Sequence, residues 1–263
     1  MVGKTGPVNG TVEVGWLLGG MVLLLVLAAA VVVRLGGIGG WLPVVTAAAR
    51  AIGQLAAVSL VIVVVLRHWW LTVVFVLVMF GIAALTSAKR ISDLRRGVLA
   101  AAAIAAGVAP VLALLLASGL VPLNPVAVVP IAGILIGGAM TATSLAGRRA
   151  LDELAGRHGE YEAALALGLG RRDAALLIVR PTANHALVPV IDQTRTVGLV
   201  TLPGTFVGVL LGGGTPVEAG ATQLLVLIAL LAIEAVAVLV TVELIASPPA
   251  CRSPGRPPRT GYP

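Results

Sequence analysis

The sequence contains few of the residues that soluble proteins place on their surfaces. Of its 263 residues, 11% are charged, 3% are aromatic and one is a cysteine. A soluble globular domain carries about 25% charged residues, so that class is excluded. The lone Cys251 permits no internal disulfide, and the few aromatic residues disfavour a transmembrane β-barrel with its aromatic girdles. The 59% of hydrophobic residues and a mean hydropathy of +1.06 instead indicate an all-α, polytopic membrane protein.

Apolar runs of roughly 20 residues, the length of a helix that crosses a bilayer, recur along the chain. They predict seven transmembrane helices, at residues 14–33, 44–66, 71–85, 98–120, 126–145, 196–211 and 221–245. The sixth is the least apolar and follows a more polar stretch at 183–195. Together they predict a transmembrane domain over 14–245, preceded by a segment at 1–13. A Pro- and Arg-rich tail at 246–263 follows, which we expect to be disordered.

The basic residues predict the orientation of these helices. The chain holds 18 Lys and Arg against 11 Asp and Glu. The loops after the fourth and sixth runs have no Lys or Arg. Basic residues gather after the third run, after the fifth run and in the tail: Lys89, Arg90, Arg95, Arg96, Arg148, Arg149, Arg157, Arg171, Arg172, Arg180, Arg252, Arg256 and Arg259. Cytoplasmic loops are rich in Lys and Arg, so we expect the N-terminus outside and the C-terminus in the cytoplasm. The net charge of +7 then reflects topology and does not predict nucleic acid as a partner.

The charged interruption at residues 146–181 contains a spaced motif of small residues. Its members are Glu162, Ala163, Ala164, Gly168, Ile178 and Pro181. Glu and Ala favour a helix, small side chains let that helix seat closely in a groove, and Gly permits a sharp turn. Pro181 should end or kink the preceding helix. This spacing resembles the cytoplasmic EAA loop of ATP-binding-cassette (ABC) importer permeases, in which a short coupling helix contacts the ATPase. An ordinary amphipathic surface helix is the alternative interpretation.

Polar residues within the predicted spans are candidates for a translocation path, because such groups tend to face the bundle interior or a wet cavity. The candidates are Arg50, Gln54, Met140, Asp192, Arg195 and Glu234. Arg50 could instead snorkel to the headgroups, Asp192 and Arg195 could simply pair along one helix, and Met140 could serve packing. Glu234 has no cation nearby in its own helix. No Cys or His spacing typical of a metal site is found, so the metal ligands stay unknown. No phosphate-binding loop is present, so ATP and Mg²⁺ are expected on a partner subunit.

Three further segments extend the resemblance to a particular family. They are RAIGQL (50–55), VVPIAG with GAM (128–133 and 138–140), and LVPVIDQTRTVGLVTLPG (187–204). With the EAA-like loop they resemble the FetB-type iron-export permease family, whose plant relatives are linked to aluminium tolerance, over residues 44–245. The chain departs from the family at Gly138, where Asn is usual, and from the general EAA pattern at Arg180.

The resemblance implies the permease subunit of an ABC transporter in the plasma membrane. Two copies would assemble with two ATP-binding subunits and export a metal ion, with iron the expected substrate. Two rivals remain from the residues alone. One is a gradient-driven secondary transporter or channel that uses Glu234 or Asp192. The other is a membrane-embedded enzyme, which is disfavoured because no nucleophile–base or metal-ligand constellation can be assembled.

Overall fold

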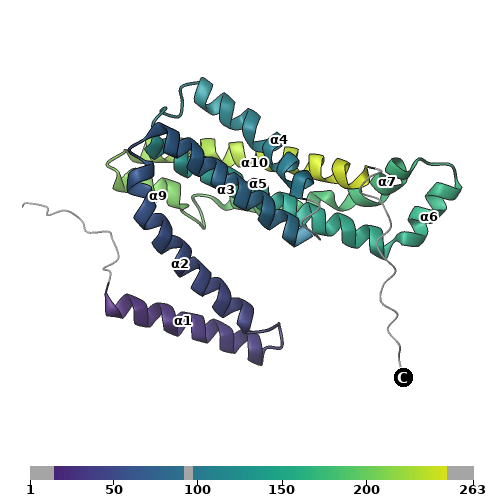
Figure 1. The fold of residues 1–263 in the computed structure, drawn as a ribbon, viewed down its shortest axis with the longest axis horizontal. Helices are drawn as coiled ribbons and strands as arrows, with labels where there is room; N and C mark the ends of the chain where they lie inside the picture. The colour runs from purple at the N-terminus through teal and green to yellow at the C-terminus, as the bar shows by residue number, and fades with distance from the viewer. Residues whose placement is uncertain (1–14, 92–96, 248–263) are drawn as a thin grey trace, which may run out of the picture. The chain divides into compact units, whose positions relative to one another are not determined.

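A computed structural model describes residues 15–91 and 97–247. The N-terminal segment 1–13, Arg95, Arg96 and the tail from residue 248 onward, including Cys251, lie outside the described residues. The chain divides into two units, Met1–Arg67 and His68–Pro263. The first unit is a hairpin of α1 (Trp16–Leu35) and α2 (Leu42–Val65), in which most side chains are apolar and exposed (Figure 1). Such a surface suits contact with lipid acyl chains.

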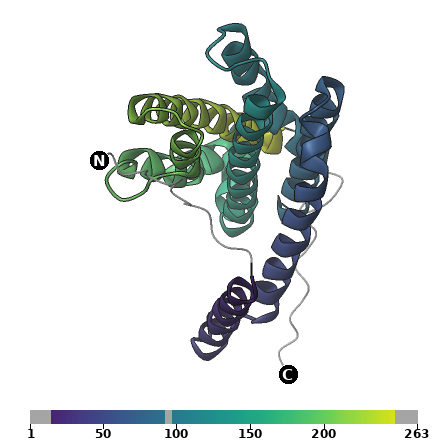
Figure 2. The ribbon, with the colours of Figure 1, turned by 90° about the vertical axis from the view of Figure 1, so that its left-hand side faces the viewer.

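The second unit is a helical bundle built around a long central helix. Its elements are α3 (Trp69–Ile91), α4 (Gly97–Ala117), α5 (Pro125–Gly156), α6 (His158–Ala166), α7 (Arg171–Ala183), η2 (Asn184–Ala186), α8 (Val188–Thr196), α9 (Gly204–Leu211) and α10 (Pro216–Ala246). The four long helices α3, α4, α5 and α10 pack against one another, with α5 among the others (Figures 1 and 2). Helices α6 and α7 lie at one end of the bundle and α9 at the other.

The starts of α5 and α10 follow from local capping signals. The Asn124 side chain accepts a hydrogen bond from the backbone of Ala127, and Thr215 forms a capping box with Glu218. A proline fills the first helical position in each case, where its missing N–H is not needed. The helices contain 32 and 31 residues, or about 48 and 46 Å at 1.5 Å per residue. Both are longer than an apolar bilayer core of about 30 Å, so part of each extends beyond it.

Small residues bring the long helices close together. A Cβ added to Gly107 of α4 would lie 2.6 Å from the carbonyl oxygen of Ile233 on α10. A Cβ on Gly133 of α5 would lie 2.8 Å from the Met79 methyl group of α3. Such close approach is the usual way in which membrane helices gain packing energy.

The predicted number of spans is confirmed, but the predicted sixth span is wrong. Seven helical stretches are long and apolar enough to cross a membrane, and the sixth is Arg171–Thr196, formed by α7, η2 and α8. Residues 197–203 form a turn with Gly198 at φ +79°, and α9 has only eight residues, about 12 Å. The sequence did not predict α7 as part of a span because this helix buries apolar side chains on one face and carries charges on the other. The charges lower the mean hydropathy of the segment.

The predicted loop at 146–181 is also largely helical. Helix α5 continues to Gly156, eleven residues beyond the predicted end of the fifth span, and α7 runs through Pro181 and ends at Ala183. Pro181 therefore lies inside the helix, two residues before its end, rather than terminating it. The apolar run ends where the arginines begin, but the backbone hydrogen bonds of the helix do not.

Candidate functional site

Helix α6 forms an exposed tip at one end of the bundle. Arg157, between α5 and α6, donates to Glu160 over 2.8 Å through Nε and again through its terminal nitrogen. The side-chain hydrogen bond lowers the pKa of Glu160 and raises the pKa of Arg157. Nδ1 of His158, the first residue of α6, lies 3.4 Å from Glu162, one turn further along the helix. These contacts stabilise the first turns of α6 from its exposed side.

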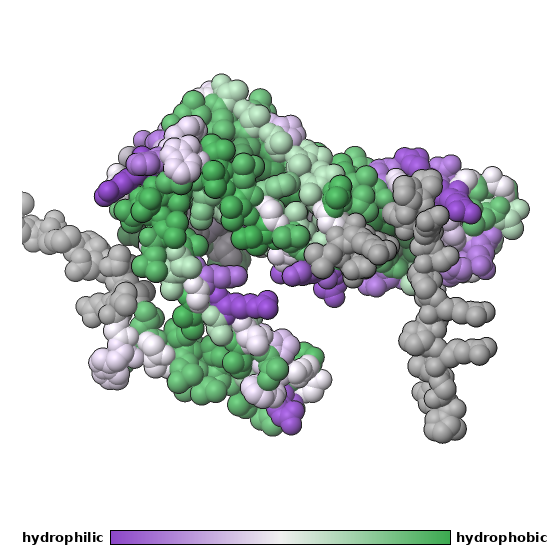
Figure 3. All heavy atoms as spheres, in the orientation of Figure 1, coloured by the Kyte–Doolittle hydropathy of each residue, from purple (hydrophilic) through white to green (hydrophobic). Residues whose placement is uncertain are grey.

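The predicted coupling residues divide between the two faces of α6. Ala164 is buried, whereas Glu162 and Ala163 are exposed. Leu167, which follows the helix, is 82% exposed. Gly168 has φ +89°, a conformation that favours glycine, and makes the turn into α7. The structure therefore offers small and apolar groups at a surface whose surroundings are hydrophilic (Figure 3).

Helix α7 connects this tip to the bundle. Ala174, Ala175 and Ile178 are fully buried where α7 packs against α5 and α10. Pro181, by contrast, is exposed. Of the predicted motif, Ile178 thus serves the packing of α7, and Ala164 the packing of α6.

An ionic bridge that the sequence did not predict joins α7 to α10. Arg180 donates to Oε1 of Glu243 over 2.6 Å, and Arg172 donates to Oε2 of the same carboxylate. Arg172 and Arg180 come from α7, and Glu243 lies near the end of α10. The bridge leaves no local pattern in the sequence, because the partners of Glu243 lie 71 and 63 positions away along the chain.

Glu234 faces an open cavity between α5, α8 and α10. Its side chain is 7% exposed, and no hydrogen bond or ion pair to it is found among the described residues. The cavity has a volume of about 280 Å³ and is lined by α5, α8 and α10, with Thr141 and Gln193 as further polar groups. A Cβ at Gly138 would lie 2.7 Å from Oε1 of Glu234. The carboxylate therefore lies next to Gly138, the position at which the family that this chain resembles usually has Asn.

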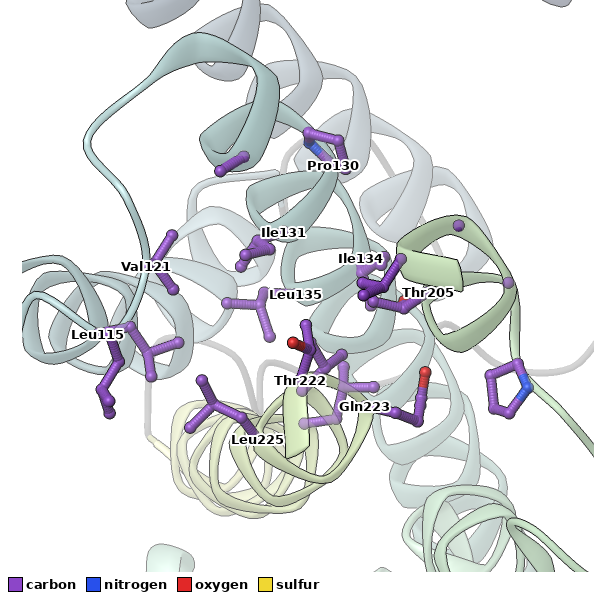
Figure 4. A pocket seen from close by; sticks show the side chains of 18 of the residues that line it. Leu115, Val121, Pro130, Ile131, Ile134, Leu135, Thr205, Thr222, Gln223 and Leu225 are labelled. Atoms are coloured by element: carbon purple, nitrogen blue, oxygen red, sulfur yellow. The ribbon is translucent and has the colours of Figure 1, made fainter. Parts of the chain in front are cut away.

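A larger cavity lies toward the end of the bundle that carries α9. It measures about 820 Å³ and is surrounded by side chains of α5, α9, α10 and the link between α4 and α5 (Figure 4). Gln193 of α8 lines both this cavity and the one that holds Glu234. Sequence reasoning missed Gln193 because a neutral side chain beside two charged neighbours gives no signal of its own.

The other predicted path residues of the second unit lie away from these cavities. Asp192 and Arg195 are exposed on α8, with 3.8 Å between Oδ1 and Nη1. Met140 is half-buried in the apolar core. Its carbonyl oxygen accepts a hydrogen bond from Ser87 of α3 over 2.9 Å, which ties α3 to α5, and another from Ser144 within α5 over 2.7 Å.

Arg50 and Gln54 belong to the first unit. Both are exposed on α2, one turn apart. They present one positive charge and one amide from the same face of that helix, and the structure does not relate them to Glu234.

A metal ion would find few ligands at these positions. No group of three or more His, Cys, Asp or Glu side chains that could hold a metal occurs in residues 15–91 and 97–247. Around Glu234 the available oxygen atoms belong to one carboxylate, one amide and one hydroxyl. Oxygen donors suit hard cations such as Mg²⁺ better than soft ones, but these four side-chain oxygen atoms are fewer than the six ligands that such an ion takes.

The fold and the enclosed polar groups define a polytopic, all-α membrane protein with cavities inside its helical bundle. The chain belongs to the Uncharacterised protein family (UPF0014), whose model matches residues 16–248. The family resemblance inferred from the motifs is thereby confirmed.

Several curated relatives support this membership. The chain is 36% identical to the rice UPF0014 membrane protein STAR2, over 69% of this chain and 65% of that protein. It is 32% identical to Protein ALUMINUM SENSITIVE 3 of Arabidopsis thaliana, over 69% and 67%. It is 33% identical to the Probable iron export permease protein FetB of Escherichia coli, over 61% and 62%. The match thus spans just under two thirds of the rice and Escherichia coli proteins. No solved structure matches the chain.

Proposed function

We propose that this chain is the membrane-spanning permease subunit of an ABC transporter. Two copies would assemble with two ATP-binding subunits, and ATP and Mg²⁺ would be bound by those subunits. The observation that carries the proposal is α6: a short helix at the hydrophilic end of the bundle, with Ala163 and Leu167 exposed. Leu169 is exposed beside Leu167, and apolar side chains gathered at such a position favour contact with another protein.

The route of coupling would run from α6 through α7 into α10. Ala164 seats α6, Ile178 and its buried neighbours seat α7, and the bridge through Glu243 fastens α7 to α10. Nine residues separate Glu243 from Glu234 on α10, about 13.5 Å along the helix axis. A rigid-body movement of α10 would therefore change the cavity around Glu234 and open it to alternate sides.

The proposed orientation places α6, the start of α7 and the C-terminus on the cytoplasmic side and the N-terminus outside. The cluster of Arg residues around α6 and the lack of Lys and Arg in residues 197–215, which follow the sixth span, support it. The plasma membrane is the proposed location. A role in transport rather than catalysis is supported by the family and by the permease named among the relatives.

The proposed substrate is a metal ion, with export of iron the specific hypothesis. It rests on the names of the relatives, one a probable iron export permease and one connected with aluminium sensitivity. Each protomer offers one buried carboxylate, so we propose that the ion crosses partly hydrated, with Glu234 as a transient counter-charge. The homodimer would bring two such carboxylates to the path.

A gradient-driven transporter is the second candidate, and the isolation of Glu234 in its cavity favours it. A buried carboxylate without a fixed partner can exchange a proton for a cation. Asp192 is less suited to this role, because it is exposed and close to Arg195.

Everted vesicles distinguish the two candidates. We expect uptake of Fe²⁺ by vesicles from cells that carry the gene, and not from cells that lack it. ABC transport requires ATP, is blocked by vanadate and survives a protonophore. Uptake that continues without ATP and collapses with the protonophore would refute the ABC assignment in favour of the second candidate.

A further inference from the structure

The cavity of about 820 Å³ in the second unit has walls unsuited to a metal ion. Its lining includes no charged side chain, and most of the residues around it are apolar (Figure 4). Four uncharged polar side chains take part: Gln193, Thr205, Thr222 and Gln223. A cation placed here would lose water without gaining an opposite charge, which is unfavourable in a low-dielectric site. The volume of about 820 Å³ lies within the range of small-molecule sites.

Gln223 supplies an independent sign of a missing partner. Its side chain is 5% exposed, and its Oε1 atom has no hydrogen-bond partner among the described residues. The residue lies on α10 in the wall of this cavity and of a smaller one of about 250 Å³. A buried carbonyl oxygen without a donor is costly. Because no protein hydrogen bond holds that oxygen, the side chain can turn it toward a ligand without breaking such a bond.

We propose that this cavity binds an uncharged, amphipathic small molecule. Its apolar body contacts the side chains of α5, α9 and α10, and a hydroxyl or N–H at one end donates to Oε1 of Gln223. This site adjoins the Glu234 cavity, with which it shares Ile134, Gln193 and Leu230, but its lining carries no charged side chain. It requires neither the ATPase nor a transported ion, so it can fail or hold independently of the proposed function.

A neutral photoreactive alcohol tests the site directly. The purified full-length protein in lipid nanodiscs is irradiated with 4-benzoylbenzyl alcohol, which joins a benzophenone to one hydroxyl donor. We expect saturable labelling of peptides that contain residues 204–209 and 222–226, measured by mass spectrometry. The matched probe 4-benzoylbenzyl-trimethylammonium has the same photoreactive group and a fixed positive charge. It should label these peptides at least about tenfold less, because its charge has no counter-charge there.

Two variants separate the hydrogen bond from the space. Gln223→Leu keeps the approximate size and removes the acceptor, so the half-saturating concentration of the alcohol should rise about tenfold. Gly208 lines the cavity, and a Cβ added there meets nothing within 4 Å. Gly208→Leu should therefore fold normally, fill part of the cavity and abolish saturable labelling. Gly20→Leu is the same change on exposed α1, where an added Cβ also meets nothing, and should leave labelling unchanged.

Three results would overturn the proposal. One is labelling that stays proportional to probe concentration and spreads over the lipid-facing surfaces of the helices. Another is equal labelling of residues 204–209 and 222–226 by the charged and the neutral probe. The third is an unchanged half-saturating concentration in Gln223→Leu, with the thermal midpoint of that variant confirming that it is folded.

Discussion

Replacing Glu243 by Gln should weaken the junction between α7 and α10 without changing the shape of the side chain. The carboxylate is contacted by Arg180 at 2.6 Å and by Arg172. The two arginine side chains are 58% and 50% exposed, and that of Glu243 is 26% exposed. Water therefore screens both pairs, and each contributes about 0.5–1 kcal/mol, the upper part of the range for exposed ion pairs. Glu243→Gln should lower the free energy of unfolding by about 1–2 kcal/mol.

Thermal unfolding of the purified protein measures this effect. For a chain of this size the expected loss lowers the midpoint by about 2–8 °C, and the difference from wild type should shrink as salt is raised. Glu153→Gln is the matched control, because Glu153 pairs with Arg149 at 3.6 Å within α5 alone. It should leave the midpoint nearly unchanged.

A double-mutant cycle decides whether the bridge is the cause. If Glu243 and Arg180 act on each other, the double variant with Gln at both positions should lose less stability than the two single changes together. Additive losses, or a salt-independent difference, would refute the bridge as the link between α7 and α10. In the transporter, a broken link should also reduce transport more than it reduces ATP hydrolysis.

Three further predictions concern packing, pH and transport. Gly107→Ala forces a methyl group against the backbone of α10 and should lower the free energy of unfolding by about 1–3 kcal/mol. In Gly137→Ala the added methyl group meets nothing within 4 Å, so the effect should be mild. Equal thermal midpoints of the two variants would contradict this prediction. The folded-state pKa of Glu160 is lowered by Arg157, so its contribution to stability is present above the unfolded pKa of about 4.3 and is lost as the pH falls through the lower folded value. The stability difference between wild type and Arg157→Gln should therefore vanish in that acidic window and persist at neutral pH. Glu234→Gln should lower transport of Fe²⁺ with little effect on ATP hydrolysis, and normal transport would remove this residue from the path.

The sequence predicted the class of fold because that class depends on the overall composition and on the number of long apolar runs. The seven spans follow from long apolar runs, and the turn at Gly168 follows from the glycine itself. Both signals are local properties of the sequence. The sixth span was missed because its apolar residues occupy one face of α7 and its charges the other. An average along the chain cannot separate two faces of one helix.

The site was predicted less completely because it depends on distant contacts. Glu234 could be proposed from its isolation within an apolar run, and the structure places it in a cavity. The bridge to Glu243 and the shared position of Gln193 require knowing which helices are neighbours. Asp192 looked equally promising in the sequence, yet it lies on the exposed side of α8.

Site-specific crosslinking from α6 in living cells tests the central claim most directly. A photoreactive phenylalanine analogue is placed at exposed Ala163, and in a control protein at exposed Val217 near the start of α10. The account predicts that position 163 crosslinks to a protein with the phosphate-binding motif of an ABC ATPase, and that position 217 does not. Crosslinking of that ATPase from 217 but not from 163, or labelling of 163 by a reagent confined to the outside of the cell, would contradict it.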